Sequence, residues 1–271
     1  VVDEPYFAFR QIMVLLYGQR KHEKTGISEK ASISDSAQIS ENCHIGDFAT
    51  ISENVEIGEG TVIYPGVFVG PDTVIGKDCL LYANSVVYNN CILGDRVIVQ
   101  ANATVGEDGF GFSTYQGQHL KIPHIGRTIL EDDVEIGSGC GIERGTLDDT
   151  VIGAGTKLGD MVAIGHGAKV GKGCLIVALS GIAGSTTVGD YCVLGGQVGI
   201  VGHIKVGNMV TIAAKAGVIN DVPDGQTIVG TPAIDAQKAK RAYALIETLP
   251  DMRKNLKKLQ KKSNKSYKKN D

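Results

Sequence analysis

The sequence predicts an all-β solenoid, in which short parallel strands stack in coils as a parallel β-helix. Three observations predict this fold: aliphatic residues recur every six positions, glycine supplies 36 of 271 residues, and all six cysteines share one position of the six-residue unit. Ordinary proteins contain about 7% glycine, and this excess lacks the three-residue period of collagen. A period of six fits neither an α-helix nor a simple alternating strand. It fits a coil that turns one corner per unit.

The repeat begins at Ile27 and continues without exception for 14 units. Its aliphatic residues are Ile27, Ile33, Ile39, Ile45, Ile51, Ile57, Ile63, Val69, Ile75, Leu81, Val87, Leu93, Val99 and Val105. A small residue four positions later is also expected to point inward. Glycine often follows the aliphatic residue, where a tight corner benefits from the absence of a Cβ. Three units close one triangular coil, which advances the chain by one strand spacing of about 4.8 Å.

Two interruptions divide the repeat. The register is lost across residues 106–128, returns at Leu130, and shifts by four residues around 147–151. A further 12 units follow, with the aliphatic residues Ile152, Leu158, Ile164, Val170, Ile176, Ile182, Val188, Leu194, Ile200, Val206, Ile212 and Val218. We therefore predict that residues 27–230 form the β-helix, with an inserted loop at 106–128.

The cysteines occupy the small inward position of their units, where Ala49 and Thr61 stand elsewhere. They are Cys43, Cys79, Cys91, Cys140, Cys174 and Cys192. A buried cysteine behaves as a small hydrophobe, and the sequence contains no CxxC pair of the kind that indicates a metal site. We expect these thiols to pack the core rather than to form disulfides or to bind a metal ion.

A helix is expected before the repeat. Residues 6–19 carry apolar residues at helical spacing, and Asp3 and Pro5 in front of them favour a helix start. We assign residues 1–26 to this helix and a linker, as the remnant of a preceding domain. The sequence shows no signal peptide, which predicts a cytoplasmic protein. No apolar run approaches the roughly 18 residues that span a membrane.

The C-terminal residues 231–271 form a Lys-rich extension with helical composition. They hold 12 basic and 4 acidic residues, a charge of +8, whereas positions 1–230 hold the other 15 basic and 26 acidic residues, a charge of −11. Nucleic acid is not an expected partner, because the body is acidic and no aromatic stacking platform accompanies the lysines.

Chemistry is expected where the repeat is broken, because a solenoid by itself is a scaffold. The insertion at 106–128 concentrates phenylalanine, histidine and glycine, which favours a binding loop over a merely flexible excursion. The shorter insertion that follows Arg144 is a second candidate, with a simple corner bulge as the alternative. The candidate substrate-binding residues are Asp108, Phe110, Phe112, Lys121, His124 and Arg144.

Two glycine-flanked histidines form a third candidate site. Gly184 follows His166 by three repeat units, which is one coil, and His203 follows it by two coils and one further position. One column would then present an imidazole, a closely approachable backbone N–H and a second imidazole, which are a base, an oxyanion donor and a supporting group for acyl transfer. The alternatives are ordinary surface histidines or metal ligands. Metal is disfavoured because His166 and His203 differ in position within their units and His44 lies on a distant coil.

Several motifs together resemble one enzyme family. They are Asp108-Gly109-Phe110-Gly111-Phe112, Lys121-Ile122-Pro123, Ile125-Gly126-Arg127, Arg144-Gly145-Thr146-Leu147-Asp148-Asp149-Thr150, Ile164-Gly165-His166, Gly184-Ser185, Gly195-Gly196-Gln197-Val198-Gly199 and Gly202-His203. The chain resembles the UDP-3-O-acylglucosamine N-acyltransferases, the hexapeptide-repeat acyltransferases of lipid A biosynthesis, over nearly its whole length from Asp3 to Pro232. Compared with that family, we expect this sequence to lack most of the N-terminal uridine-binding domain.

The resemblance implies a left-handed β-helix, a homotrimer with clefts between subunits, and a defined reaction. A 3-hydroxyacyl chain moves from the phosphopantetheine of acyl carrier protein to the 2-amino group of UDP-3-O-acyl-glucosamine, with no cofactor and no metal. His166 matches the family's general base, Gly184 the oxyanion donor and His203 a supporting histidine. Where the family often has Asp-Asn, this chain has Gly159 and Asp160, and Asp160 is a candidate to orient His166.

Two other functions remain open at this stage. The chain could be an N- or O-acyltransferase that uses acyl-coenzyme A and another nucleotide-linked sugar, or it could be a non-catalytic structural solenoid. The basic extension likewise has two interpretations, a solvated helix or a docking surface for the acidic acyl carrier protein.

Overall fold

The computed structural model describes residues 4–22, 25–231, 233 and 235–267, so Asp3 and Pro232 lie outside the described residues. The chain divides into two compact units, 1–230 and 231–271. Each is treated by itself below.

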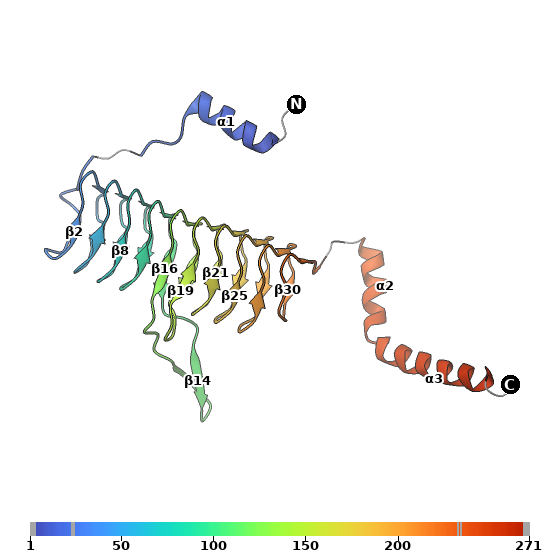
Figure 1. Cartoon of the computed structure of the whole chain (residues 1–271). Coiled ribbons are helices and arrows are strands. Elements are labelled where there is room, and N and C mark those ends of the chain that lie inside the picture. The colour runs from blue at the N-terminus through green and yellow to red at the C-terminus, as the bar shows by residue number, and fades with distance from the viewer. Residues whose placement is uncertain (1–3, 23–24, 232, 234, 268–271) are drawn as a thin grey trace. The chain divides into compact units, whose positions relative to one another are not determined.

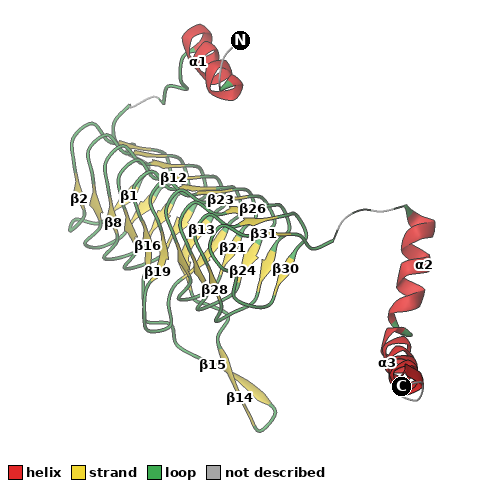
Figure 2. Ribbon diagram, turned by 45° about the vertical axis from the view of Figure 1, so that its right-hand side comes forward, coloured by secondary structure: helices red, strands yellow, loops and turns green. Residues whose placement is uncertain are grey.

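The first unit contains a parallel β-helix whose two- to four-residue strands form three sheets, one on each side of the coil (Figures 1 and 2). Sheet 1 consists of β1 (Ser32–Ile33), β4 (Thr50–Ile51), β7 (Phe68–Val69), β10 (Val86–Val87), β13 (Thr104–Glu107), β18 (Gly141–Glu143), β21 (Ala163–Ile164), β24 (Gly181–Ile182), β27 (Gly199–Ile200) and β30 (Gly217–Val218). Sheet 2 consists of β2 (Gln38–Ile39), β5 (Glu56–Ile57), β8 (Val74–Ile75), β11 (Ile92–Leu93), β16 (Thr128–Leu130), β19 (Thr150–Ile152), β22 (Lys169–Val170), β25 (Thr187–Val188) and β28 (Lys205–Val206). Sheet 3 consists of β3 (His44–Ile45), β6 (Val62–Ile63), β9 (Leu80–Leu81), β12 (Ile98–Val99), β17 (Glu135–Ile136), β20 (Lys157–Leu158), β23 (Leu175–Ile176), β26 (Val193–Leu194), β29 (Thr211–Ile212) and β31 (Thr227–Ile228). The predicted left-handed parallel β-helix is confirmed.

The strand register follows the predicted coil of three six-residue units. Val86 pairs with Thr104, which stands one coil of three units further along the chain. Thr104 in turn pairs with Gly141, so the first insertion makes this coil about twice as long as its neighbours. Glu135 pairs with Lys157, four positions beyond one full coil, which is the predicted four-residue insertion. Both insertions leave the coil as loops, so the stacking of strands continues past them without a change of sheet.

The core is the interior of the coil, filled by the aliphatic residue of each unit. Ile45, Val87 and Leu194 are fully buried, and the residues four positions later, such as Ala49 and Cys91, are buried with them. The packing prediction for the cysteines is confirmed, because all six are buried. Each coil adds one more layer of aliphatic contacts to the core.

The glycines after the aliphatic residues serve a different purpose from the one predicted. A Cβ on Gly58 would lie 2.5 Å from the carbonyl carbon of Gly76 on the next coil, and one on Gly70 would lie 2.5 Å from the nitrogen of Asn89. The left-handed backbone of the corner falls at other positions, for example at Asn42 (φ 57°) and Asn54 (φ 56°). Close approach between coils, rather than the bend itself, therefore requires glycine here.

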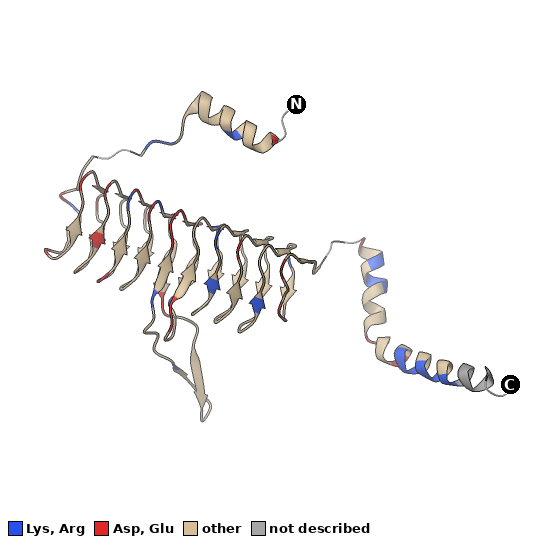
Figure 3. Cartoon of the chain, viewed as in Figure 1, with Lys and Arg blue, Asp and Glu red and all other residues tan. Residues whose placement is uncertain are grey.

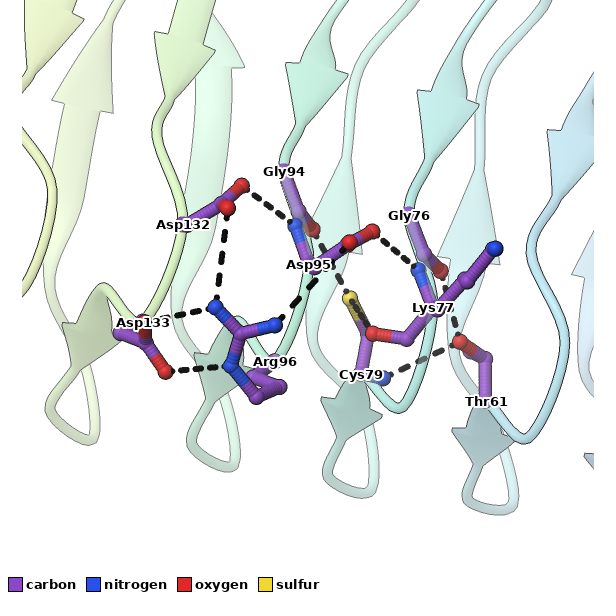
Figure 4. A network of polar contacts seen from close by, with 9 residues as sticks. All are labelled: Thr61, Gly76, Lys77, Cys79, Gly94, Asp95, Arg96, Asp132 and Asp133. Carbon is purple, nitrogen blue, oxygen red and sulfur yellow. Dashed lines mark hydrogen bonds and ion pairs between the residues drawn. The ribbon is translucent and has the colours of Figure 1, made fainter.

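Polar ladders along the corners satisfy the backbone between coils (Figure 4). Asp95 accepts the backbone N–H of Lys77 at 2.8 Å, and Asp132 accepts that of Asp95 at 2.9 Å. Arg96 makes a bidentate contact with Asp133 at 2.6 and 2.7 Å. These bonds replace strand pairing at positions where the chain turns.

The first insertion is a β-hairpin rather than an unstructured loop (Figures 1 and 2). Strands β14 (Phe112–Tyr115) and β15 (Gln118–Lys121) pair antiparallel and project from the β-helix, and all eight residues are exposed. The turn passes through Gln116 and Gly117, both of which have positive φ. The two arms of the hairpin meet at its base, where the backbone N–H of Ile122 donates to the backbone oxygen of Gly111 at 2.9 Å.

Helix α1 (Pro5–Tyr17) precedes the repeat, with Pro5 in its first turn and Gly18 beyond its end. None of its residues is buried. The linker that follows contacts two stacked tyrosines of the first coils. His22 shares a hydrogen bond of 2.7 Å with the Tyr64 hydroxyl, and Tyr64 stacks on Tyr82 with ring centroids 5.0 Å apart.

The second unit consists of α2 (Ala236–Ile246) and α3 (Leu249–Tyr267). Asp235 caps α2 by accepting the N–H groups of Gln237 and Lys238 at 3.1 Å. The two helices are separated by a turn at Glu247 and Thr248. Pro250 lies in the first turn of α3, where its missing N–H removes no helical hydrogen bond. Lysine and arginine residues recur along both helices (Figure 3). Among the described residues, no helix combines the length and the apolar character needed to cross a membrane.

Candidate functional site

The predicted column of His166 and Gly184 is present on one corner of the β-helix. Ala163 on β21 pairs with Gly181 on β24, which places the residues that follow each strand directly above one another. A Cβ on Gly184 would lie 2.6 Å from Nε2 of His166 and 2.8 Å from two carbons of its ring. The imidazole therefore lies against the backbone of the next coil, and a glycine is needed to admit it.

The two nitrogens of the His166 ring have different surroundings. Nδ1 lies 3.2 Å from the Thr146 hydroxyl, on the second insertion, while Nε2 faces Gly184. With its proton on Nδ1 and the hydroxyl oxygen accepting it, the ring presents an unprotonated Nε2 toward the neighbouring coil. Among the described residues, the backbone N–H of Gly184 donates to no protein acceptor, so it is available to a bound oxyanion.

A pocket of about 700 Å³ lies in front of this ring. Its floor is the outer surface of sheet 1, where the column of small residues Gly141, Ala163, Gly181 and Gly199 leaves a shallow apolar channel. Phe110 forms part of its wall from the base of the hairpin. The ionisable residues that line it are Glu107, Glu143 and His166.

The base of the hairpin packs closely on the site because of Gly109. A Cβ at this position would lie 2.7 Å from His124 Nε2, 2.7 Å from His166 Cβ and 2.9 Å from a carboxylate oxygen of Glu143. The rings of His124 and His166 meet edge to face at 5.4 Å. The first insertion and the histidine column, predicted as separate candidates, thus form one site.

The aromatic residues of the first insertion extend this site outward. Phe110 and Phe112 contact each other with ring centroids 5.2 Å apart, and both are exposed. With Thr114 and His119 they line a second cavity of about 540 Å³. Phe110 borders both cavities, so an apolar ligand could continue from one to the other.

Other predicted residues lie differently. Arg144 is buried, and its guanidinium donates to the backbone oxygens of Gly106 and Asn89 at 2.7 and 2.8 Å, so it holds the start of the insertion and does not face the pocket. Lys121 pairs with Asp108 at 2.9 Å, and this hydrogen bond lowers the pKa of the Asp108 carboxyl. His124 is buried under the glycines of the loop.

Asp160, the candidate to orient His166, does not contact its ring, and His203 does not share the column of His166 and Gly184. The carboxylate of Asp160 accepts the N–H of Ser138 at 2.9 Å on another corner, and Thr146 is the ring partner of His166 instead. His203 donates its backbone N–H to the oxygen of Gly184 at 3.2 Å, but it is not among the residues that line the pocket. It is one residue too far along the corner to share the column of His166.

Two glutamates and a threonine in the site were not predicted as functional residues. Glu143 accepts the backbone N–H of His166 at 2.9 Å, and Glu107 is its register partner on the neighbouring strand. Thr146 reaches the ring from an insertion whose path the six-residue period does not specify. The register of Val105 with Ile142 would place Glu107 opposite Arg144, and a local irregularity pairs it with Glu143 instead. No sequence signal marks this irregularity or locates Thr146.

Part of the β-helix is similar to a known family of bacterial transferases. Residues 36–71 and 72–107 match the family model "Bacterial transferase hexapeptide (six repeats)". The resemblance predicted from the motifs is confirmed as well: the chain is similar to the UDP-3-O-acylglucosamine N-acyltransferases. It is 41% identical to that of Methylobacterium sp. (strain 4-46) over 147 residues, which are 54% of this chain and 42% of the relative. It is 52% identical to that of Leptospira biflexa over 84 residues, which are 31% of this chain and 24% of the relative. The matched segments thus span less than half the length of these relatives.

Solved structures extend the likeness to most of the chain. The UDP-N-acetylglucosamine acyltransferase of Francisella novicida is 26% identical, with a TM-score of 0.59 over 80% of this chain and 73% of that chain. The Arabidopsis enzyme of the same name shares the fold, with a TM-score of 0.69 at 24% identity over 75% of this chain and 71% of that chain.

Proposed function

We propose that the protein is an N-acyltransferase of lipid A biosynthesis, which moves a 3-hydroxyacyl chain from acyl carrier protein to the 2-amino group of UDP-3-O-acyl-glucosamine. The observation that carries the proposal is the position of the His166 imidazole against Gly184, inside a pocket with an apolar floor. The names of the curated relatives supply the substrate class.

In the proposed mechanism, Nε2 of His166 acts as the general base. The acceptor nitrogen attacks the thioester carbonyl carbon, and Nε2 takes the proton that the nitrogen loses. The carbonyl oxygen becomes an oxyanion, toward which the Gly184 N–H donates. The tetrahedral intermediate collapses, the carbon–sulfur bond breaks, and the imidazolium returns its proton to the leaving thiolate. Thr146 keeps the ring in the required orientation, and His203 supports the corner through its backbone.

The pocket suits an acyl chain. A hydrocarbon can lie on the small residues of sheet 1, where side chains larger than alanine would fill the channel. The thioester is already activated and the nucleophile is an amine, so the mechanism calls for no cofactor and no metal. We further propose a cytoplasmic homotrimer in which neighbouring copies complete the clefts, because a flat sheet face is buried most simply by threefold closure.

Transfer of a radiolabelled acyl chain tests the proposal. Hydroxyacyl carrier protein and acetyl-coenzyme A would serve as alternative donors, with UDP-linked glucosamine acceptors. We expect transfer from the carrier protein, and we expect His166→Ala to reduce turnover by about 10²–10⁴-fold. His44→Ala, on a distant coil, is the matched control and should leave turnover unchanged. Transfer only from acetyl-coenzyme A would identify a different acyltransferase, and inactivity with every donor would favour a structural solenoid.

A further inference from the structure

Glu107 faces a second carboxylate in the floor of the pocket. It ends β13 and is the register partner of Glu143, which ends β18, after a local irregularity in strand pairing. Neighbouring residues on parallel strands carry their side chains to the same face of a sheet. Both glutamates line the pocket together with His166. Two like charges are thus held side by side next to the proposed base.

The hydrogen bonds of these two carboxylates differ. Glu143 accepts the backbone N–H of His166 at 2.9 Å, so one of its oxygens is already engaged. Glu107 has one oxygen, Oε2, that is inaccessible to solvent and has no hydrogen-bond partner in the described part of the chain. A buried acceptor without a donor is costly, which disfavours the charged form of this carboxylate. Its other oxygen, Oε1, lies beside Gly141 in the pocket floor, on the side from which a ligand can approach.

The positive groups nearby are directed elsewhere. The backbone N–H of Arg144 donates to the backbone oxygen of Glu107 and not to its carboxylate, and the Arg144 guanidinium contacts Gly106 and Asn89 instead. Lys121 is paired with Asp108. Burial, together with the charge of Glu143, raises the pKa of Glu107 to about 7. The Cys91 thiol and the two histidines of the site, His124 and His166, are the other titratable groups around it.

We propose that Glu107 binds the amino group of the acceptor as an ammonium and takes one proton from it, so that a neutral amine is presented to the thioester. This inference rests on the proposed function, since it specifies how that acceptor enters the site. A primary ammonium supplies three donors and a positive charge, which suit the two carboxylates that line the pocket. The other residues that line the pocket are glycine, alanine, isoleucine, valine and phenylalanine, which offer no competing charge.

The proton balance of this step is complete. One N–H bond of the ammonium breaks, its electron pair remains on nitrogen, and the proton forms an O–H bond on Glu107. The neutral amine then attacks, and His166 removes the second proton and transfers it to the leaving thiolate. Glu107 finally releases its proton to water, so the overall reaction converts thioester and ammonium into amide, thiol and one proton.

Binding measurements test the inference without acyl transfer. UDP-glucosamine and UDP-glucose differ at the position in question by an amino group in place of a hydroxyl, and titration calorimetry in buffers of different ionisation enthalpy counts the protons released. We expect the protein to bind UDP-glucosamine about tenfold or more tightly than UDP-glucose at neutral pH, as for a charge-assisted hydrogen bond. At about pH 6, where Glu107 is protonated when the pocket is empty, binding of the ammonium should release close to one proton. This release should decline as the pH rises through 7.

Glu107→Gln keeps the shape of the side chain and removes its charge. It should abolish both the amine preference and the proton release, while Glu135→Gln, on sheet 3 outside the pocket, should preserve them. In turnover assays, Glu107→Gln should raise the KM for the amine acceptor about tenfold or more with a much smaller change in kcat. An unchanged preference and unchanged proton release in Glu107→Gln would overturn the inference. If that variant does not fold, absence of proton release from the unaltered protein at pH 6 overturns it equally.

The two proposals fail separately. Amine preference and proton release that depend on Glu107, without acyl transfer from any donor, would support the binding role and reject the proposed function. Acyl transfer to UDP-linked glucosamine with an unchanged KM in Glu107→Gln would support the proposed function and reject the binding role of Glu107.

Discussion

A single contact, that of His166 with Gly184, connects the sequence period to the proposed chemistry. The interval of three repeat units predicted that these two positions share a column, and the structure places the ring against that glycine. The period could not predict the direction of the ring, because Thr146, which contacts Nδ1, comes from an insertion. Counting repeat units thus predicts which backbone positions lie next to each other on neighbouring coils. The positions of side chains that come from the insertions can be learned only from the structure.

Gly184→Ala should abolish most of the proposed acyl transfer, because it displaces the proposed base. The added Cβ would lie 2.6 to 2.8 Å from three atoms of the His166 ring, closer than carbon and nitrogen atoms can approach, so the ring must move. We expect a loss of turnover of about 10²-fold, in line with a displaced reacting group, without loss of the fold. Gly217→Ala is the matched control, because a Cβ on Gly217, in the strand β30 of sheet 1, meets nothing within 4 Å. Equal activity of the two variants would refute the argument.

Arg144 shows where sequence reasoning assigned the wrong role. An arginine in an insertion next to a candidate site suggested substrate binding, yet its side chain is buried and bonded to the backbone around Gly106 and Asn89. The loss of the six-residue period at 106 predicts where the coil opens, but it does not reveal that the opened backbone oxygens need a buried donor. The same arginine is therefore needed to begin the hairpin insertion.

Arg144→Gln should destabilise the protein rather than weaken substrate binding directly. Loss of several charged hydrogen bonds in a buried setting costs about 2–3 kcal/mol. Hydrogen exchange should show the loss first around residues 106–111, because repeat proteins open locally. Arg96→Gln, in the exposed network of Figure 4, should have little effect on exchange. Protection at 106–111 that is the same in Arg144→Gln as in the unaltered protein would contradict this role.

At the scale of elements, the strands were predictable and the insertions only in part. Each strand follows from an aliphatic residue in a unit of six, and the two register shifts gave the positions of both insertions. The hairpin was expected only as a binding loop. Its strand residues pair with each other and are all exposed, so they show no pattern of buried residues from which strands could be predicted. Similarly, helical composition predicted one C-terminal helix, and the turn at Glu247 and Thr248 divides it.

Removal of the hairpin should separate stability from binding. Residues 112–121 can be deleted and Gly111 joined to Ile122, because these two residues already share a hydrogen bond. All eight strand residues of the hairpin are exposed, so thermal unfolding of the β-helix should be unchanged. The KM for the acyl donor should rise, since the cavity lined by Phe112 is lost. A large fall in the unfolding temperature would show that the hairpin supports the coil, contrary to this expectation.

At the scale of the whole molecule, stability increases with each additional coil, whereas the proposed chemistry is confined to the coils around the two insertions. Such a fold is predictable from one sequence, because each unit repeats the same local rule and contacts only its neighbours. The C-terminal unit follows no such rule, and its distinguishing property is a charge of +8, against −11 for positions 1–230.

Truncation after Gly230 should therefore change recognition of an acidic carrier protein without unfolding the β-helix, because the chain divides into compact units at this position. The body that remains is acidic and repels an acidic partner, whereas α2 and α3 carry lysines and arginines (Figure 3). With the full chain, salt at several hundred millimolar should screen the attraction and raise the KM for acyl carrier protein severalfold. The truncated chain should show a high KM already at low salt, with no further rise as salt is added, and an unchanged unfolding temperature. If the KM of the full chain does not respond to salt, the basic extension has no part in docking, and its lysines act only as solvated surface.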